Sequence, residues 1–338
     1  MDARHGAAHK QYVGVDVAAA TVTAAWMGCN ERMSGPIKIA QTVQGYATLH
    51  ARLATTGIAP ADTLVVLEAT GSYWITLATT LVEYGYHVSV INPKQAHNFA
   101  KALLKRAKTD AIDAQPLARL GALLQPAPHP EGTRPPPAIY PELQQRLVHR
   151  DALIAMCQQL RNQRHALVQQ PYVVASVRAR LDALIATLTT EVMALDREIA
   201  ATLVQDDAWA EAAVRLQTIT GVGVITTAWV LTATLNFTLC RSPEALTAYA
   251  GLAPTPHQSG TSVWKRSAIG HTGHAQLRTV LYLASLSAAQ HNAAITPFYD
   301  RLRAAGKSSK VARCAAARKL LHIAWAVATK GQPFDPQY

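Results

Sequence analysis

The stretch Lys108-Thr109-Asp110-Ala111-Ile112-Asp113-Ala114 decides how we interpret this chain. It leads into a pattern over residues 113–120 that predicts a helix. Residues three apart on a helix lie on one face, so Asp110 and Asp113 are expected to point the same way. Two adjacent carboxylates repel each other unless a cation lies between them, and Mg²⁺ prefers such oxygen ligands. The alternative is that each acid caps the helix or interacts with its dipole.

Two further acids follow runs that predict buried strands. Asp16 comes after residues 12–15, and Glu68 ends the run 64–67. An unpaired charge buried there would be costly, although a strand-end acid exposed to water is the alternative for each residue alone. The order of these acids is that of a ribonuclease-H-like nuclease core: one acid after a first strand, one after a later strand, and an acid pair on a helix. In such cores two metals flank the scissile phosphate.

The charge of the chain indicates a polyanionic partner. Its formal net charge is +11, from 32 Lys and Arg against 21 Asp and Glu. Such an excess favours nucleic acid, although a solvated basic face is the alternative. After Glu244 the sequence contains only two acids, Asp300 and Asp335. We expect phosphate contacts from cations in this part of the chain and from cations just before the acid pair. These cations are Lys101, Lys105, Arg106, Lys108, Lys265, Arg266, Arg278, Lys307 and Lys310.

Other classes of protein are disfavoured. The four cysteines show no paired spacing, so neither a disulfide framework nor a zinc knuckle is expected. The polar N-terminus does not resemble a secretory signal. No run approaches the roughly 18 apolar residues that a membrane span needs. We therefore expect a cytoplasmic protein with no membrane partner.

The first 125 residues predict an α/β domain. Strands are expected at 12–17, 21–26 and 37–43, as an antiparallel meander. A helix at 45–56, a strand at 64–68, a helix at 74–84 and a strand at 87–91 follow, before the helix with the acid pair. This order predicts a mixed sheet with helices on its faces.

The middle of the chain predicts a linker and a helical hairpin. Seven prolines lie within residues 126–141, which we interpret as a stiff linker. Residues 142–207 contain two long helical patterns separated near Pro171. The second has a coiled-coil-like seam, which pairs either within an antiparallel hairpin or with another subunit; its positions are Val177, Leu181, Leu184, Leu188, Val192, Leu195, Ile199 and Leu203.

Residues 208–338 predict a mainly α-helical C-terminal domain. The turn at Gly221 and Gly223 resembles a helix-hairpin-helix, whose backbone amides approach phosphate, although a plain tight turn explains the glycines nearly as well. Residues 251–262 predict a long loop that contains Ser259, which from the residues alone is a turn residue. His274 is expected to cap a helix or contact phosphate. Helices are expected at 225–235, 243–249, 276–289 and 309–329.

Several motifs together carry a resemblance to a known family. They are Val13-Gly14-Val15-Asp16, Leu67-Glu68-Ala69-Thr70-Gly71-Ser72-Tyr73, Lys108-Thr109-Asp110-Ala111-Ile112-Asp113-Ala114, Tyr249-Ala250-Gly251-Leu252-Ala253-Pro254, Gln258-Ser259-Gly260 and Gly270-His271-Thr272-Gly273-His274. In this order and spacing they resemble the DEDD-type transposases of the IS110 and IS1111 insertion sequences, which are described as bridge-RNA-guided recombinases. The resemblance covers nearly the whole chain.

The resemblance implies a RuvC-like domain that holds Mg²⁺, or alternatively Mn²⁺, through Asp16, Glu68, Asp110 and Asp113. It also implies a C-terminal transposase domain in which Ser259 attacks a DNA phosphate and forms a phosphoserine link. The implied partners are the DNA of the element ends and target, a structured guide RNA, and further copies of the chain in a dimer or tetramer. The sequence departs from the family pattern at Ala18, Ala19 and Ala20, where the family commonly has a lysine.

Two other functions fit part of the sequence. The same four acids would serve a Holliday-junction nuclease that uses water as its nucleophile. A nucleic-acid-binding protein with a degenerate site is the second alternative, suggested by the missing lysine. An actin-like ATPase shares the order of elements, but Asp16-Val17-Ala18 lacks the glycine of a phosphate-binding loop.

Overall fold

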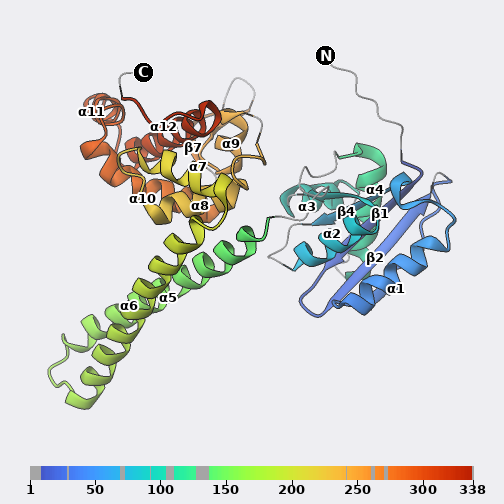
Figure 1. Ribbon diagram of the computed structural model, residues 1–338, viewed down its shortest axis with the longest axis horizontal. Coiled ribbons are helices and arrows are strands. Elements are labelled where there is room, and N and C mark those ends of the chain that lie inside the picture. Colours follow the sequence, from blue (N-terminus) through green and yellow to red (C-terminus); the bar gives the residue numbers. More distant parts are fainter. Residues whose placement is uncertain are drawn as a thin grey trace. The chain divides into compact units, whose positions relative to one another are not determined.

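The computed structural model describes residues 9–28, 30–68, 73–91, 93–103, 110–126, 137–240, 242–259, 263–269 and 273–336. Contacts divide the chain into two compact units, Met1–Pro135 and Pro136–Tyr338. Figure 1 shows an α/β unit and a mainly helical unit, which we describe separately. The helices and strands within each unit therefore set the positions of the candidate site residues.

The α/β unit is built on a five-stranded mixed sheet in the order β3-β2-β1-β4-β5. The antiparallel meander is β1 (Gln11–Val17), β2 (Thr21–Gly28) and β3 (Ile37–Ala40). Strands β4 (Thr63–Glu68) and β5 (His87–Ile91) run parallel to β1. The helices are α1 (Val43–Ala54), α2 (Trp74–Glu83), α3 (Pro93–Ala102) and α4 (Asp110–Leu124), with a short 3₁₀ turn at Pro60–Asp62. The predicted order of elements is confirmed, except that α3 lies between β5 and α4, where no helix was predicted.

Each face of this sheet has its own core, because side chains alternate along a strand. Val13, Val15 and Val65 belong to the core that α1 and α2 cover. Tyr12 and Val66 belong to the core on the opposite face, together with Leu117 and Ala118 of α4. The even-numbered residues of β1 and β4 therefore point toward the α4 face.

The predicted third strand is too long. The structure ends β3 at Ala40 and begins α1 at Val43, which is largely exposed. Thr42 caps this helix by accepting a hydrogen bond from the Gly45 amide at 3.2 Å. The apolar residue at position 43 thus lies on the outer face of a helix instead of continuing the strand, and the cap decides the boundary.

The helical unit packs around α8 (Val224–Thr234), most of whose residues are buried. Around it lie α7 (Asp207–Gln217), α9 (Pro243–Tyr249), α10 (Ala275–His291), α11 (Thr296–Ala304) and α12 (Ser309–Lys330). The predicted helices at 225–235, 243–249, 276–289 and 309–329 are confirmed to within two residues. The sequence interpretation did not include α3, α7 or α11.

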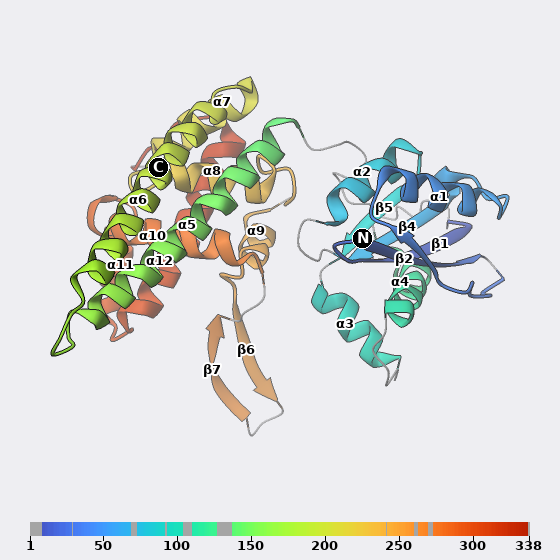
Figure 2. The same ribbon diagram turned by 90° about the horizontal axis from the view of Figure 1, so that it is seen from below.

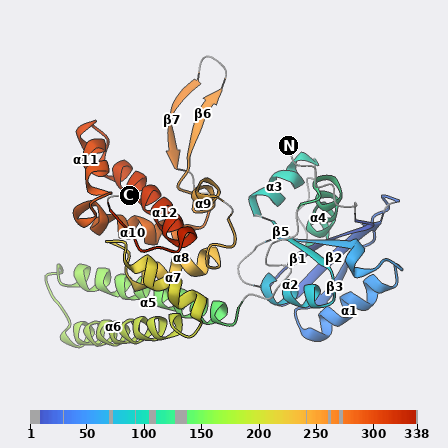
Figure 3. The same cartoon turned by 45° about the horizontal axis from the view of Figure 1, so that its top comes forward.

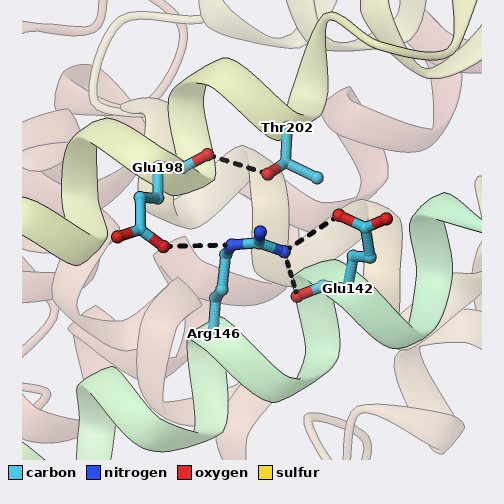
Figure 4. A network of polar contacts seen from close by, with 4 residues as sticks. All are labelled: Glu142, Arg146, Glu198 and Thr202. Atoms are coloured by element: carbon cyan, nitrogen blue, oxygen red, sulfur yellow. Dashed lines mark hydrogen bonds and ion pairs between the residues drawn. The ribbon is translucent and has the colours of Figure 1, made fainter.

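The two long helices form an intramolecular antiparallel hairpin, α5 (Ile139–Leu167) and α6 (Ala175–Leu203), which extends from the rest of the helical unit in Figure 1. Ion pairs join the two helices in the inner half of the hairpin, the half that packs against the other helices of the unit. Here Arg146 pairs with Glu142 at 3.1 Å and with Glu198 at 3.2 Å (Figure 4). Only Ile199 and Leu203 of the predicted seam are buried, and Leu184 is 52% exposed. Because α5 begins at Ile139, the last residues of the predicted linker are helical, and residues 127–136 lie outside the described part.

The predicted long loop at 251–262 is wrong. Two antiparallel strands, β6 (Pro254–Ser259) and β7 (Val263–Ile269), form a ribbon that projects from the helices in Figures 2 and 3. Two prolines and a glycine in this segment suggested a loop, but prolines are tolerated in a ribbon whose strands both have free edges. No helix in the described ranges combines the length and apolarity needed to span a membrane.

Candidate active site

Asp16 and Glu68 occupy neighbouring positions at the same end of two adjacent parallel strands. The register pairs Val15 of β1 with Leu67 of β4, and the next position on each strand is the acid. Both acids are partly exposed, whereas the residues before them are buried. By the alternation described above, both point toward the α4 face. Since adjacent strands lie about 4.8 Å apart, two carboxylates are held close together.

Helix α4 begins at this same end of the sheet. A Cβ added at Gly14 would lie 2.0 Å from the Ala114 carbonyl oxygen and 2.2 Å from the Ala118 amide nitrogen, so α4 crosses β1 in close contact there. The end of the helix lies near the start of the strand, because the Gln125 side chain donates to the Tyr12 hydroxyl at 3.2 Å. The helix therefore runs opposite to β1, and its first turn lies toward Asp16.

That first turn contains Asp110 and Asp113, three residues apart at the start of α4. Their backbone is helical, as the sequence predicts, but their side chains lie outside the described part of the structure. Among the side chains that are described, no three acids, histidines or cysteines form a cluster that could hold a metal. The backbone thus brings four acidic positions to one end of one sheet face.

Ala18, Ala19 and Ala20 form the exposed turn between β1 and β2, close to Asp16 along the chain. The Ala18 amide donates to the Thr21 carbonyl at 2.9 Å, which closes the turn. The position where the family commonly has a lysine is therefore beside the acids and open to solvent. In this chain its side chain is a methyl group, so any cation there must come from another segment.

Ser259 is the last residue of β6, next to the ribbon turn, and its pair across the ribbon is Val263. From the start of β6 at Pro254, five residues of strand span about 17 Å. Gly273 anchors the base of the ribbon: its φ is +95°, and an added Cβ would lie 2.5 Å from the Gly251 amide nitrogen. The Ser259 side chain lies outside the described part. The fold thus displays the serine at the end of a ribbon.

His274 follows the ribbon and caps α10, as one of the two predicted roles requires. Its Nδ1 accepts a hydrogen bond from the Leu277 amide at 3.1 Å. The ring packs against Trp229 and Tyr249, with centroids 6.2 Å and 5.7 Å away. Burial lowers the pKa of His274, and the positive charge of Arg278 lowers it further. Since a neutral ring can accept at Nδ1 while a protonated ring cannot, the low pKa preserves the cap.

The structure gives a packing reason for one of the two predicted phosphate-binding glycines. Gly221 has φ +99°, and an added Cβ would lie 2.8 Å from the Ala288 Cβ of α10. Gly223 caps α8 and has open space around it, so its backbone is accessible. Gly221 is therefore required by helix packing, whereas only Gly223 offers an approach to a ligand.

The predicted basic contacts are spread over several elements. Lys101 is exposed in the last turn of α3, Lys307 is exposed in the turn before α12, and Lys310 is exposed in its first turn. Arg278 on α10 donates to the Ala250 carbonyl at 3.4 Å. Lys265 and Arg266 lie on β7, with side chains outside the described part; Lys105, Arg106 and Lys108 lie wholly outside it.

Two positioning residues were missed by the sequence interpretation, Gly14 and Gly273. Both were quoted in the motifs, but neither was given a role. Gly14 lies inside an otherwise apolar strand, and such a glycine often marks a close approach of another backbone. That signal was available in the sequence, whereas the positive φ of Gly273 was not.

Comparisons with known proteins give matches over both units of the chain. A family model described as "Transposase", for the DEDD domain of IS110 elements, matches residues 13–173, and one described as "Transposase IS116/IS110/IS902 family" matches residues 213–300. The pilin gene-inverting protein of Moraxella bovis is 31% identical over 96% of this chain and 98% of its own length. Its counterpart in Moraxella lacunata is 30% identical over the same shares.

An uncharacterized 43.6 kDa protein of the insertion element IS110 from Streptomyces coelicolor is 31% identical over 50% of this chain and 42% of its own length. The two family models together cover the acidic positions of the first unit and the serine ribbon of the second. The long matches to the gene-inverting proteins include both units. The chain therefore belongs to the DEDD-type IS110 family of transposases, and it is an enzyme that recombines DNA.

Proposed function

We propose that this protein is a divalent-metal-dependent, RNA-guided recombinase of an insertion sequence, with Asp16, Glu68, Asp110 and Asp113 as metal ligands and Ser259 as the nucleophile. The observation that carries the proposal is the convergence of acidic positions on the α4 face: Asp16 and Glu68 end neighbouring strands, and α4 begins at the same end. An acid quartet on a mixed sheet is the arrangement expected of a RuvC-like nuclease domain.

The donor set fits a hard cation. Carboxylate oxygens suit Mg²⁺, and Mn²⁺ accepts the same ligands. When bound, such an ion supplies positive charge at the phosphate and lowers the pKa of an oxygen nucleophile. The chain's own contribution is rigid positioning: β1 and β4 fix two acids through their register, and Gly14 lets α4 approach closely enough to bring the other two.

Ser259 is placed to act on a phosphate bound elsewhere. In the proposed step its Oγ forms a bond to phosphorus, and the bond from phosphorus to a deoxyribose oxygen breaks. The serine loses its proton and the departing oxygen gains one, so the numbers of bonds and protons balance. A later attack on the phosphoserine by a deoxyribose hydroxyl rejoins a strand and restores the serine. The ribbon would provide the reach, because β6 and β7 project from the helices of their unit (Figures 2 and 3).

The proposed partners follow from the family and the charge. DNA binding belongs to any transposase, and the exposed lysines of α3 and α12 suit its phosphates. A structured RNA that pairs with target and donor DNA would supply sequence recognition. We propose a homodimer or homotetramer, because acids and serine lie in separate units that different copies could combine.

The serine role is tested with supercoiled DNA carrying the element ends, together with the RNA of the element. Wild-type protein should form a covalent protein–DNA adduct, and Ser259→Ala should form none, whereas Ser262→Ala, three residues further along the chain, should retain it. Adducts formed by Ser259→Ala would rule out the serine. Cleavage without adducts in both wild type and Ser259→Ala would instead identify a junction nuclease that uses water.

A further inference from the structure

The outer half of the α5–α6 hairpin carries an excess of positive charge that the proposed chemistry does not use. Residues 158–182, the hairpin tip, contain Arg161, Arg164, Arg178 and Arg180, with Asp182 as the only acid. Asp182 pairs with two of them, at 2.6 Å from Arg164 and 3.8 Å from Arg178. Even after this pairing, the tip has a surplus of cations.

The inner half of the same hairpin differs in charge and in burial. There Arg146 is paired with Glu142 and Glu198, and Arg150 with Asp151 and Asp196, so that acids outnumber these arginines. The inner half also contributes Leu143, Leu147, Ile199 and Leu203 to the core of the helical unit. Its charges therefore serve to join α5 and α6 where they meet the other helices.

The tip arginines have no such structural role. In residues 137–240, all of which are described, α5 buries no residue after Cys157 and α6 buries none before Ile199. Each helix has 29 residues, which corresponds to roughly 43 Å, so the tip lies far along the hairpin from that core. Arg161 and Arg180 are exposed there. Arginines that do not pack and are not neutralised are available for a partner.

The turn between the helices adds an exposed aromatic ring. Tyr172 is 78% exposed, and the amide side chains of Gln169 and Gln170 beside it are also exposed. The apolar residues Val168 and Val174, which flank the turn, are 40% and 45% exposed. An exposed aromatic ring beside amides, with arginines more than one helical turn away along both helices, matches how proteins hold unpaired nucleotides: the ring stacks on a base while cations contact the phosphates.

We propose that the hairpin tip binds unpaired nucleotides, with Tyr172 stacking on a base and Arg161 and Arg180 contacting the neighbouring phosphates. The loops of a structured RNA and single-stranded DNA share this chemistry. Duplex DNA alone does not, because the faces of its bases are stacked inside the helix and cannot stack on a tyrosine ring. The inference rests on the proposed function only in taking nucleic acid with unpaired segments as a partner, and it does not depend on Ser259 or on the acids.

A second copy of the chain is the other conceivable occupant, since Val177 and Leu184 of the seam are 43% and 52% exposed. The arginines argue against two tips in direct contact, because like charges brought together without acids repel. The apolar seam and the arginine-rich surface can also be tested separately, since Arg161, Tyr172 and Arg180 are not seam positions.

The test uses the full-length protein and fluorescence anisotropy with three labelled probes: an RNA stem-loop, a single-stranded DNA of the same loop sequence, and a blunt DNA duplex. Arg161→Ala/Arg180→Ala should raise Kd for a single-stranded probe or the stem-loop at least tenfold. A plot of the logarithm of the association constant against the logarithm of salt concentration should become less steep, by about 1.4 for two lost phosphate contacts on a single strand. Arg32→Ala/Arg52→Ala removes two exposed arginines of the α/β unit and should change Kd less than twofold.

Tyr172→Ala should raise the same Kd roughly fivefold or more, as expected for the loss of one stacked base, while Tyr172→Phe should retain wild-type affinity. The duplex Kd should change less than twofold in the arginine double variant and in Tyr172→Ala.

Whether binding of the stem-loop or of the single-stranded DNA is affected identifies which of them is the source of the unpaired nucleotides. Unchanged binding of both, or an equal loss on the duplex, would overturn the proposal, as would a change in oligomeric state without a change in Kd. Ser259→Ala should bind normally, so a failure of the recombination chemistry remains distinguishable.

Discussion

The acidic positions and the serine ribbon are held in place by different means. The acids lie at the end of a packed sheet, where strand register and the contact of Gly14 with α4 determine their positions. The serine lies at the end of a two-stranded ribbon whose base is held where Gly273 meets Gly251. The acidic part of the candidate site is therefore fixed by packing, whereas the position of Ser259 depends on how the ribbon is held at its base. Substitutions that disturb the packing of α4 on the sheet should affect the acids, and substitutions at the ribbon base should affect the serine.

The largest effect is expected when an acid is neutralised. Asp16→Asn and Asp110→Asn should each lower recombination by about 10³-fold or more, because each removes a charge from the proposed metal site, and 10³-fold corresponds to about 4 kcal/mol of barrier. Recombination of a plasmid carrying the element measures this. Asp62→Asn is the control, since Asp62 lies before β4 at the other end of the sheet and pairs with Lys10. Full recombination activity in Asp110→Asn would contradict the proposed role of Asp110 as a metal ligand.

A substitution at Gly14 should break the packing that brings α4 to the sheet. In Gly14→Ala the new Cβ would overlap the backbone of α4, and we expect a loss of about 1–3 kcal/mol of stability together with recombination. Hydrogen exchange followed by mass spectrometry should show faster exchange in peptides from β1 and α4. Gly35→Ala is the control, because nothing lies within 4 Å of its added Cβ. Unchanged exchange in Gly14→Ala would contradict the close contact.

The ribbon base should respond to Gly273→Ala. Both Gly273 and Gly306 have a positive φ, at +95° and +75°, so alanine costs about 1 kcal/mol of backbone strain at either. Only at Gly273 does the Cβ also meet another backbone. We therefore expect roughly tenfold slower adduct formation in Gly273→Ala and less than a twofold change in Gly306→Ala. Equal rates in the two variants would show that the ribbon base does not position the serine.

The smallest effect is a pH dependence at His274. Its pKa in the folded protein is lowered, mainly by burial, so the unfolded chain takes up a proton first as the pH falls. The contribution of His274 to stability is therefore complete above its ordinary pKa of roughly 6.5, and it is lost as the pH falls from there through the folded pKa. Urea unfolding at a series of pH values measures this. His274→Asn keeps a capping oxygen without titrating, and it should reduce the dependence.

The sequence predicted the α/β unit well because its signals are local. Apolar runs located β1, β4 and β5, the last of them between Gly85 and Pro93, and the short connections implied the meander. The face shared by Asp16, Glu68 and α4 needed the structure, since the direction of α4 across β1 follows from contacts between residues about a hundred positions apart.

The helical unit was less predictable. Residues 254–269 contain two prolines and one glycine, which favour turns, yet cross-strand pairing makes most of this segment a ribbon. One boundary in the α/β unit was also mispredicted: the start of α1 depends on the cap at Thr42, whereas the apolar pattern suggested that β3 continues to Val43. The seam of α6 suggested burial along its length, but a hairpin of two helices covers only one side of each, and Leu184 stays exposed. Ser259 acquired its proposed role only from the resemblance, because the segment around it contains no acid that could activate it together with a histidine.

The central claim is that acids from the strand ends and from α4 hold one metal site, and Mn²⁺ titration by calorimetry tests it most directly. Wild-type protein and Asp62→Asn should bind Mn²⁺ alike, while Asp16→Asn and Asp110→Asn should each lose affinity. The double variant should lose little more than either single variant, because both residues act on the same ion. Wild-type affinity in Asp110→Asn, or losses that simply add in the double variant, would contradict a shared site.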